Sequence, residues 1–149
     1  MKKYFIISTV VLLGLILAAC SGPTSSAPAA PSNPTSSVAD LTQTKDEASV
    51  TVKVTPLNLG DKSAATLDFE IVLDTHSVDL TYDLVSIATL RSDAGDEVQP
   101  EKWDGPTGGG HHVSGTLSFP QMTDRRRSLM LILRGIAGVP ERTFVWKVN

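Results

Sequence analysis

Three histidines and one aspartate are the residues of this 149-residue chain best suited to carry chemistry. His111 and His112 are adjacent and directly follow three consecutive glycines. His76 is the third histidine, and Asp74 lies two positions before it. Neutral imidazole is a common ligand of zinc and copper, and a carboxylate can complete such a ligand set. These residue types predict a divalent-metal site in which Asp74, His76, His111 and His112 converge at one end of the fold.

The spacing of the histidines leaves a second interpretation open. Adjacent residues of a strand point to opposite faces of a sheet, so His111 and His112 reach one ion only if the glycine-rich loop extends as far as His111. The spacing also matches no closed zinc motif, and Cys20 is the single cysteine of the chain. In the alternative interpretation one imidazole hydrogen-bonds the loop while the other faces water.

The sequence lacks the patterns that are typical of a hydrolase or a calcium loop. A nucleophilic serine would need an activating base and an oxyanion site, and the motif Gly-x-Ser-x-Gly is absent. The spacing of Asp74, Asp79 and Asp83 does not fit a helix–loop–helix calcium site, and turn chemistry explains aspartate and serine in this segment. We therefore expect a protein that is not an enzyme.

The charge pattern excludes one class of partner. Of the thirteen lysines and arginines, Lys2 and Lys3 lie in a predicted signal peptide, which leaves eleven bases against sixteen acids and a net charge of −5. Nucleic-acid binding calls for clustered bases, so no nucleic-acid partner is expected. The run Arg125-Arg126-Arg127 is typical of a solvated loop, and a contact with anionic lipid headgroups or wall polymers is its alternative.

The elements that must position these residues have the two-residue period of strands. Apolar and polar residues alternate in about seven segments that are separated by turn signals, and no helical period is sustained. The segments are residues 50–55, 67–74, 84–91, 96–103, 113–119, 129–133 and 144–148. Short, regularly spaced strands predict an all-β fold, an antiparallel immunoglobulin-like β-sandwich over residues 48–149. A small barrel is the alternative.

The first twenty residues have the layout of a secretory signal. A basic head precedes an apolar run over residues 4–19, which is short for a membrane span of roughly 20 residues. The run ends in Leu17-Ala18-Ala19-Cys20, which is similar to the lipobox of bacterial lipoproteins. The resemblance implies removal of residues 1–19 and a diacylglyceryl group on Cys20. An uncleaved membrane anchor is the alternative.

The segment between Cys20 and the first predicted strand is expected to be a tether. Residues 20–47 are dominated by serine, proline, threonine and alanine, and they show little apolar periodicity. Such a segment cannot bury enough apolar surface to offset the entropy of ordering, so it is predicted to be disordered. A glycosylated or partner-binding segment is the alternative.

Four phrases of the folded part carry a further resemblance. They are residues 73–80, 103–112 (Trp-Asp-Gly-Pro-Thr-Gly-Gly-Gly-His-His), 117–120 and 138–142. Together they resemble an uncharacterised family of secreted or lipid-anchored prokaryotic domains. The resemblance covers residues 48–149, and it implies an autonomous extracytoplasmic domain without transferring a catalytic role.

These observations predict a non-catalytic binding or accessory module that is held on the extracytoplasmic face of the cell membrane or outer membrane by lipid on Cys20. Its expected ligand is a divalent metal, zinc or copper, bound through the histidines. A structural or protein-interaction domain of the cell envelope, with an envelope protein as partner and no metal, is the alternative.

Overall fold

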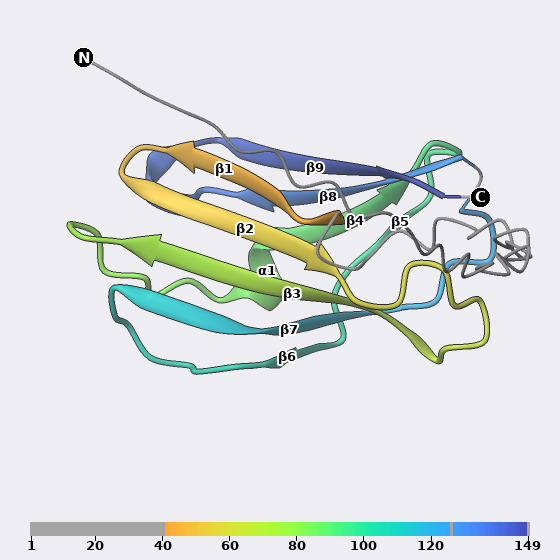
Figure 1. The fold of residues 1–149 in the computed structure, drawn as a ribbon, viewed down its shortest axis with the longest axis horizontal. Coiled ribbons are helices and arrows are strands. Elements are labelled where there is room, and N and C mark those ends of the chain that lie inside the picture. The colour runs from red at the N-terminus through yellow and green to blue at the C-terminus, as the bar shows by residue number, and fades with distance from the viewer. Residues whose placement is uncertain (1–40, 126, 149) are drawn as a thin grey trace, which may run out of the picture. The chain divides into compact units, whose positions relative to one another are not determined.

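A computed structural model of the chain describes residues 41–125 and 127–148 (Figure 1). The predicted signal peptide, Cys20 and most of the predicted tether lie outside the described residues, as do Arg126 and Asn149. The predictions for residues 1–40 therefore stay predictions.

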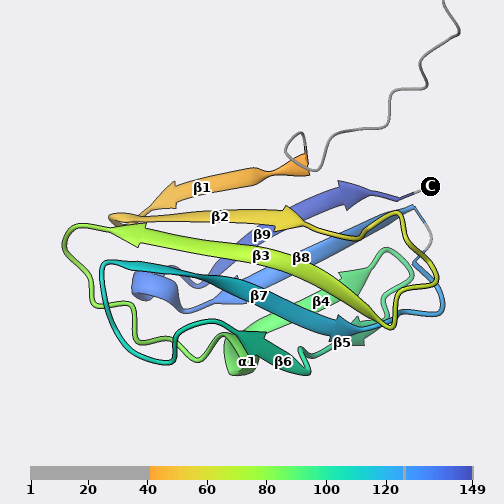
Figure 2. The ribbon, with the colours of Figure 1, turned by 60° about the horizontal axis from the view of Figure 1, so that its bottom comes forward.

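The described residues form two antiparallel sheets that pack face to face (Figures 1 and 2). The five-stranded sheet has the order β1 (Gln43–Glu47), β2 (Val50–Pro56), β3 (Thr66–Thr75), β7 (His112–Pro120), β6 (Lys102–Asp104). The four-stranded sheet has the order β5 (Glu97–Val98), β4 (Ala88–Ser92), β8 (Ser128–Arg134), β9 (Glu141–Lys147). Two short helices, α1 (Leu84–Ile87) and the 3-10 helix η2 (Ile136–Gly138), lie in connections. The all-β sandwich is confirmed, while the immunoglobulin-like arrangement stays a prediction.

The core follows directly from the alternating pattern of the strands. Alternate residues of the central strand β3, from Leu67 to Leu73, are buried, while the residues between them face outward. Aromatic rings join the two sheets, because Phe69 of β3 contacts Trp146 of β9 at a centroid distance of 5.4 Å. A ring of β7, Phe119, meets Phe69 edge-on at 5.7 Å. The packing of these rings therefore helps to hold the two sheets together.

The folded part begins earlier than the predicted boundary at residue 48. Strand β1 pairs with β2 and reaches across to the edge of β9, where the Gln43 amide donates to Val145 O at 2.6 Å and accepts from Val145 N at 3.2 Å. Leu41 O accepts a hydrogen bond from the Trp146 indole at 2.7 Å. The predicted tether is thus wrong for residues 43–47. Polar residues occupy both faces of β1, so it carries no apolar period.

Two predicted strands are corrected by the structure. The segment predicted as one strand over residues 84–91 begins with the helical turn α1, whose N-cap Asp83 accepts from Val85 N at 3.1 Å. The predicted return strand over residues 96–103 is divided between the two sheets, with Pro100 between β5 and β6. A proline lacks the N–H that a continuous strand requires. This division and strand β1 together give nine strands in the described residues rather than about seven.

Arg142 lies on the inner face of β9 and is only 1% exposed. Its guanidinium donates to Ile136 O at 2.8 Å and to Glu47 O at 2.7 Å. These two carbonyls belong to the β8–β9 connection and to the β1–β2 hairpin. Arg142 therefore fastens two connections at one end of the sandwich.

Arg142→Ala is expected to lower the free energy of unfolding by about 3 kcal/mol, because it leaves two carbonyls without their charged donor and opens a cavity. The measurement is chemical denaturation followed by tryptophan fluorescence. The control is Arg91→Ala, which removes an exposed ion pair with Glu97 and should cost below about 1 kcal/mol. Equal losses for the two variants would contradict the fastening role of Arg142.

Candidate functional site

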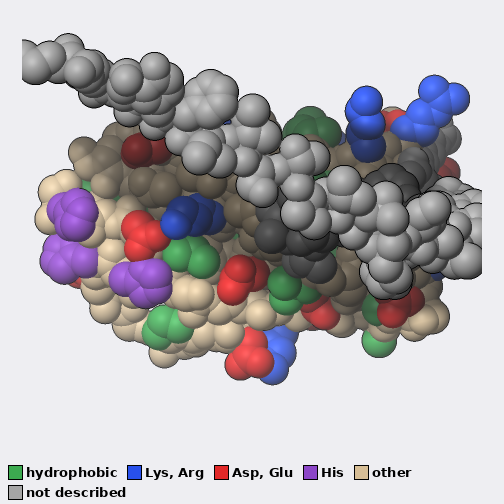
Figure 3. All heavy atoms as spheres, viewed as in Figure 1, with side chains coloured by type: hydrophobic (Ala, Val, Ile, Leu, Met, Phe, Trp, Pro, Cys, Tyr) green, Lys and Arg blue, Asp and Glu red, His purple; other side chains and the backbone are tan. Residues whose placement is uncertain are grey.

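The predicted metal-binding residues lie along one hollow at an end of the sandwich. The hollow has a volume of 760 Å³ and is lined by Asp46, Ser49, Thr51, Asp74, Thr75, His76, Ser77, His111 and His112. Figure 3 shows the three histidine side chains gathered at that end, with acidic and basic side chains beside them. All three are exposed. The structure thus brings the four predicted residues to a single surface feature, although they come from separate segments of the chain.

The best-defined contact of the hollow joins Asp74 to His112. These residues face each other in the register of β3 and β7 and point outward from the sheet. His112 Nδ1 lies 2.5 Å from Asp74 Oδ1. The other carboxylate oxygen, Asp74 Oδ2, is 4.0 Å from Lys53 Nζ on the neighbouring strand β2. Because Nδ1 of His112 faces the carboxylate, its Nε2 is left for another partner.

The glycine-rich loop is held against the segment that follows β3. Asp79 accepts a hydrogen bond from Gly110 N at 3.0 Å, and Leu80 N donates to Gly110 O at 3.1 Å. A Cβ at Gly109 would lie 2.2 Å from Asp79 Oδ1, so any other residue here would have to displace the Asp79 carboxylate. This clamp, which is the contact between residues 109–111 and 75–80, sets the distance between the two histidine-bearing segments.

The clamp also determines whether the adjacent residues His111 and His112 can face the same hollow. Thr75 N donates to His111 O at 2.9 Å, and β7 begins only at His112. The loop therefore extends as far as His111, which is the condition for both imidazoles to reach one hollow. The strict alternation of a strand does not apply to this pair.

Thr75 was not singled out from the sequence, yet it positions His76. Its buried hydroxyl donates to Ser49 O at 2.7 Å and accepts from Ser77 N and Val78 N at 3.2 and 3.3 Å. The chain therefore turns sharply after β3, and His76 projects from that turn. Threonine after an apolar strand is a weak signal for such a turn, because it is equally common within strands.

The histidines do not form a finished ligand set as they lie. In the described part of the chain, no three His, Cys, Asp or Glu side chains stand close enough together to share an ion. Of the four predicted residues, Asp74 and His112 are the pair whose side chains are joined by a hydrogen bond in the described part of the chain. His76 and His111 would have to rotate toward His112, and their exposure leaves them room to do so.

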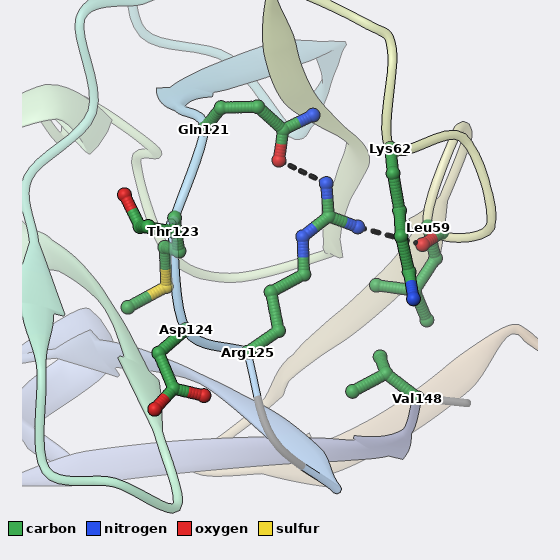
Figure 4. Close-up of a pocket in the computed structure, with 8 residues that line it drawn as sticks. Leu59, Lys62, Gln121, Thr123, Asp124, Arg125 and Val148 are labelled. Carbon is green, nitrogen blue, oxygen red and sulfur yellow. Dashed lines mark hydrogen bonds between the residues drawn. The ribbon is translucent and has the colours of Figure 1, made fainter.

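A second hollow of 460 Å³ is lined by Arg125, and Figure 4 shows it in close-up. It lies after the last residues of β7 and β9, at the end of the sandwich opposite the histidines. The sequence predicts a solvated loop here, and for Arg125 this is wrong, because its side chain is buried. Its guanidinium donates to the carbonyl oxygen of Leu59 at 2.9 Å. A run of three arginines gives no indication of which member turns inward.

Comparison with known proteins adds no relative to this description. No family model, no curated protein sequence and no solved structure matches the chain. Over residues 41–125 and 127–148, no helix is long and apolar enough to cross a membrane. The functional argument therefore depends on the residues themselves.

Gly109→Ala is expected to lower the free energy of unfolding by about 1–2 kcal/mol, because the new methyl group displaces Asp79 and breaks its bond to Gly110 N. Amide exchange at Leu80 should become faster in this variant. The matched control is Gly108→Ala in the same loop, where a Cβ meets no atom within 4 Å. If both variants exchange at the wild-type rate, the clamp does not position the loop.

Proposed function

We propose that the chain is a lipid-anchored, non-catalytic binding module on the extracytoplasmic face of a bacterial membrane, and that it binds a divalent metal, zinc or copper, in the histidine hollow. One observation carries the metal proposal: His76, His111 and His112, which are the only histidines of the chain, line the same hollow. Neutral imidazole is a common ligand of zinc and copper, so three imidazoles at one hollow favour metal binding there.

Asp74 supports the proposal as the hydrogen-bond partner of a ligand rather than as a ligand itself. Metal-binding histidines usually donate their second ring N–H to a carboxylate, which fixes the tautomer and the ring orientation. The contact of Asp74 Oδ1 with His112 Nδ1 has this form. Nε2 of His112 then carries the lone pair, and it is the atom to which we assign the first metal bond.

His76 and His111 are the other two proposed metal ligands. They belong to the two segments that the clamp joins, residues 75–80 and residues 109–111. Their segments are already held together by backbone hydrogen bonds, so binding has to order exposed side chains but not the loop. Lys53 opposes binding, because its ammonium lies 4.0 Å from the Asp74 carboxylate and repels a second cation. The site should therefore bind exchangeable metal rather than hold a permanent structural ion.

A domain that contacts another envelope protein without metal is the second candidate. The Asp74 carboxylate already has His112 and Lys53 as partners, so its charge is partly satisfied before any ion arrives. The same exposed loops could present a polar surface to a protein partner. The two candidates differ in whether the folded state is stabilised by metal.

Zinc or copper is expected to raise the thermal stability of the full-length chain in nonionic detergent, followed by tryptophan fluorescence. A ligand that binds only the folded state adds about 2.7 kcal/mol at a hundredfold excess over its Kd. His112→Ala should remove the shift. Asp74→Asn should weaken binding by about 10-fold or more, because the imidazole loses its orienting partner.

Ser77→Ala is the matched control, since Ser77 lines the same hollow but offers no metal ligand of comparable strength. It should bind metal like the wild type. If a hundredfold excess over micromolar metal produces no shift in the wild type, the metal proposal fails and the protein-interaction candidate takes its place.

The anchor is tested separately at Cys20. Acyl chains hold a protein on a membrane by about 0.8 kcal/mol per buried methylene, so two or more chains give a stable anchor. In Cys20→Ser the chain is expected to keep residues 1–19 and to lose all acyl mass. Intact-mass spectrometry of the wild type and the variant is the measurement. An unmodified thiol with residues 1–19 attached in the wild type would refute the lipobox assignment.

A further inference from the structure

The hollow around Arg125 lies at the end of the sandwich opposite the histidines and shares no residue with the histidine hollow. Its lining combines apolar and basic side chains. The lining residues are Leu59, Lys62, Gln121, Met122, Thr123, Asp124, Arg125 and Val148. Figure 4 shows the Arg125 side chain reaching between Gln121 and Leu59, with Lys62 and Val148 on the same side of the hollow.

Arg125 is 9% exposed and is bonded to neutral acceptors. Its guanidinium donates to Leu59 O at 2.9 Å, to Asp61 O at 3.5 Å and to the amide oxygen of Gln121. A guanidinium has five N–H groups, and within the described residues these three bonds use one on Nη1 and both on Nη2. The Nε–H and the second N–H of Nη1 make no bond to the described residues, and Arg125 lines the hollow. These two N–H groups are the donors left for a ligand in the hollow.

The positive charge of Arg125 has no carboxylate within ion-pair distance in the described part of the chain. The charge of Asp61 acts on Arg125, but hydrogen bonds from Ser63 and Ala64 hold the Asp61 carboxyl in its own turn and lower its pKa. Burial lowers the pKa of Arg125, and the charge of Asp61 only partly opposes this. An anion in the hollow would offset the desolvation of the guanidinium.

A second cation and an apolar wall accompany Arg125. Lys62 lines the hollow and makes no ion pair within residues 41–125 and 127–148. Leu59, Met122 and Val148 supply the apolar part of the wall. Asp124 also lines the hollow, and Figure 4 shows its carboxylate on the opposite side of the backbone from the guanidinium.

We propose that this hollow binds an oxyanion, the phosphate or carboxylate group of a small ligand with an apolar body, through Arg125 and Lys62. A guanidinium matches the planar pairs of oxygens in such groups, and an ammonium adds an adaptable point charge. Leu59, Met122 and Val148 then contact the apolar body. Gln121 holds the guanidinium in place, since its amide nitrogen donates to Ala64 O at 2.8 Å and its oxygen faces Arg125.

The experiment is an NMR titration of the full-length chain in nonionic detergent, read at the side-chain Nε–H of Arg125. The probes are inorganic phosphate, hexanoate, dihexanoyl phosphatidylglycerol and, as the zwitterionic comparison, dihexanoyl phosphatidylcholine. We expect saturable shifts with the three anions and weaker binding of the zwitterion. Saturation by the anionic lipid alone identifies a lipid headgroup as the source, whereas saturation by phosphate alone would leave the apolar wall without a role and overturn that part of the proposal.

Lys62→Ala is the decisive variant, because Lys62 is exposed and its loss leaves the packing intact. It should weaken anion binding by about 10-fold, the effect of one lost charge-assisted contact. Arg125→Lys lacks the Nε–H, so it is followed at the side-chain amide of Gln121, which contacts the guanidinium in the wild type, and it should weaken binding further. Arg127→Ala is the matched control, since Arg127 is exposed and does not line the hollow, and it should bind like the wild type.

The proposal is overturned if no probe shifts the Arg125 resonance at concentrations on the order of 10 mM, where even weak specific binding is detectable. It is also overturned if Lys62→Ala and Arg127→Ala weaken binding equally, which would indicate general attraction to a basic surface. Neither outcome depends on metal binding at the histidines, so the anion proposal and the metal proposal are tested independently.

Discussion

The antiparallel register of β3 with β7 is the constraint on which both the core and the histidine hollow depend. It sets Leu73 opposite Val113 on the inner face and Asp74 opposite His112 on the outer face. A slip of one residue would move every side chain of a strand to the other face, and it would exchange a buried pair for a charged one. The apolar residues of the core thus fix the geometry of the polar site next to them. Beyond the ends of these strands, the hydrogen bond from Gly110 N to Asp79 keeps the two connecting segments in contact.

The strands with an apolar face could be predicted from the sequence, and those without one could not. Strands β2, β3, β7, β8 and β9 bury alternate residues, and their segments are the ones in which the period is visible. Strand β1 escaped prediction because its half-buried positions are Gln43, Lys45 and Glu47, which are held by pairing and by a side-chain amide. The division at Pro100 and the turn at Asp83 depend on local backbone chemistry, which is weaker evidence in a sequence than a run of apolar residues.

The candidate site was predictable in its members but not in its geometry. Residue type alone singled out His76, His111, His112 and Asp74, and the hollow contains all four. What the sequence could not supply was the distance between residues 76 and 111, because that distance is set by hydrogen bonds across 31 positions between Asp79 and Gly110. Three glycines in a row suggested a loop with special backbone needs. The structure assigns the close approach to Gly109, where a side chain would collide with its anchor.

Two arginines are buried among the residues that the structure describes, and comparing them shows why one is structural while the other is a candidate for ligand binding. Both give their hydrogen bonds to neutral acceptors, which keeps a guanidinium solvated by the protein in place of water. Arg142 lies in a closed interior, and its Nε is a buried nitrogen without a partner, so nothing can reach it. Arg125 borders a hollow of 460 Å³ with Lys62 beside it. Burial removes water from both charges, but only at Arg125 does the structure leave space for an anion to replace it. Since an accessible, partly desolvated cation attracts an oxyanion more strongly than a fully hydrated one, the open position of Arg125 rather than its charge distinguishes it from Arg142.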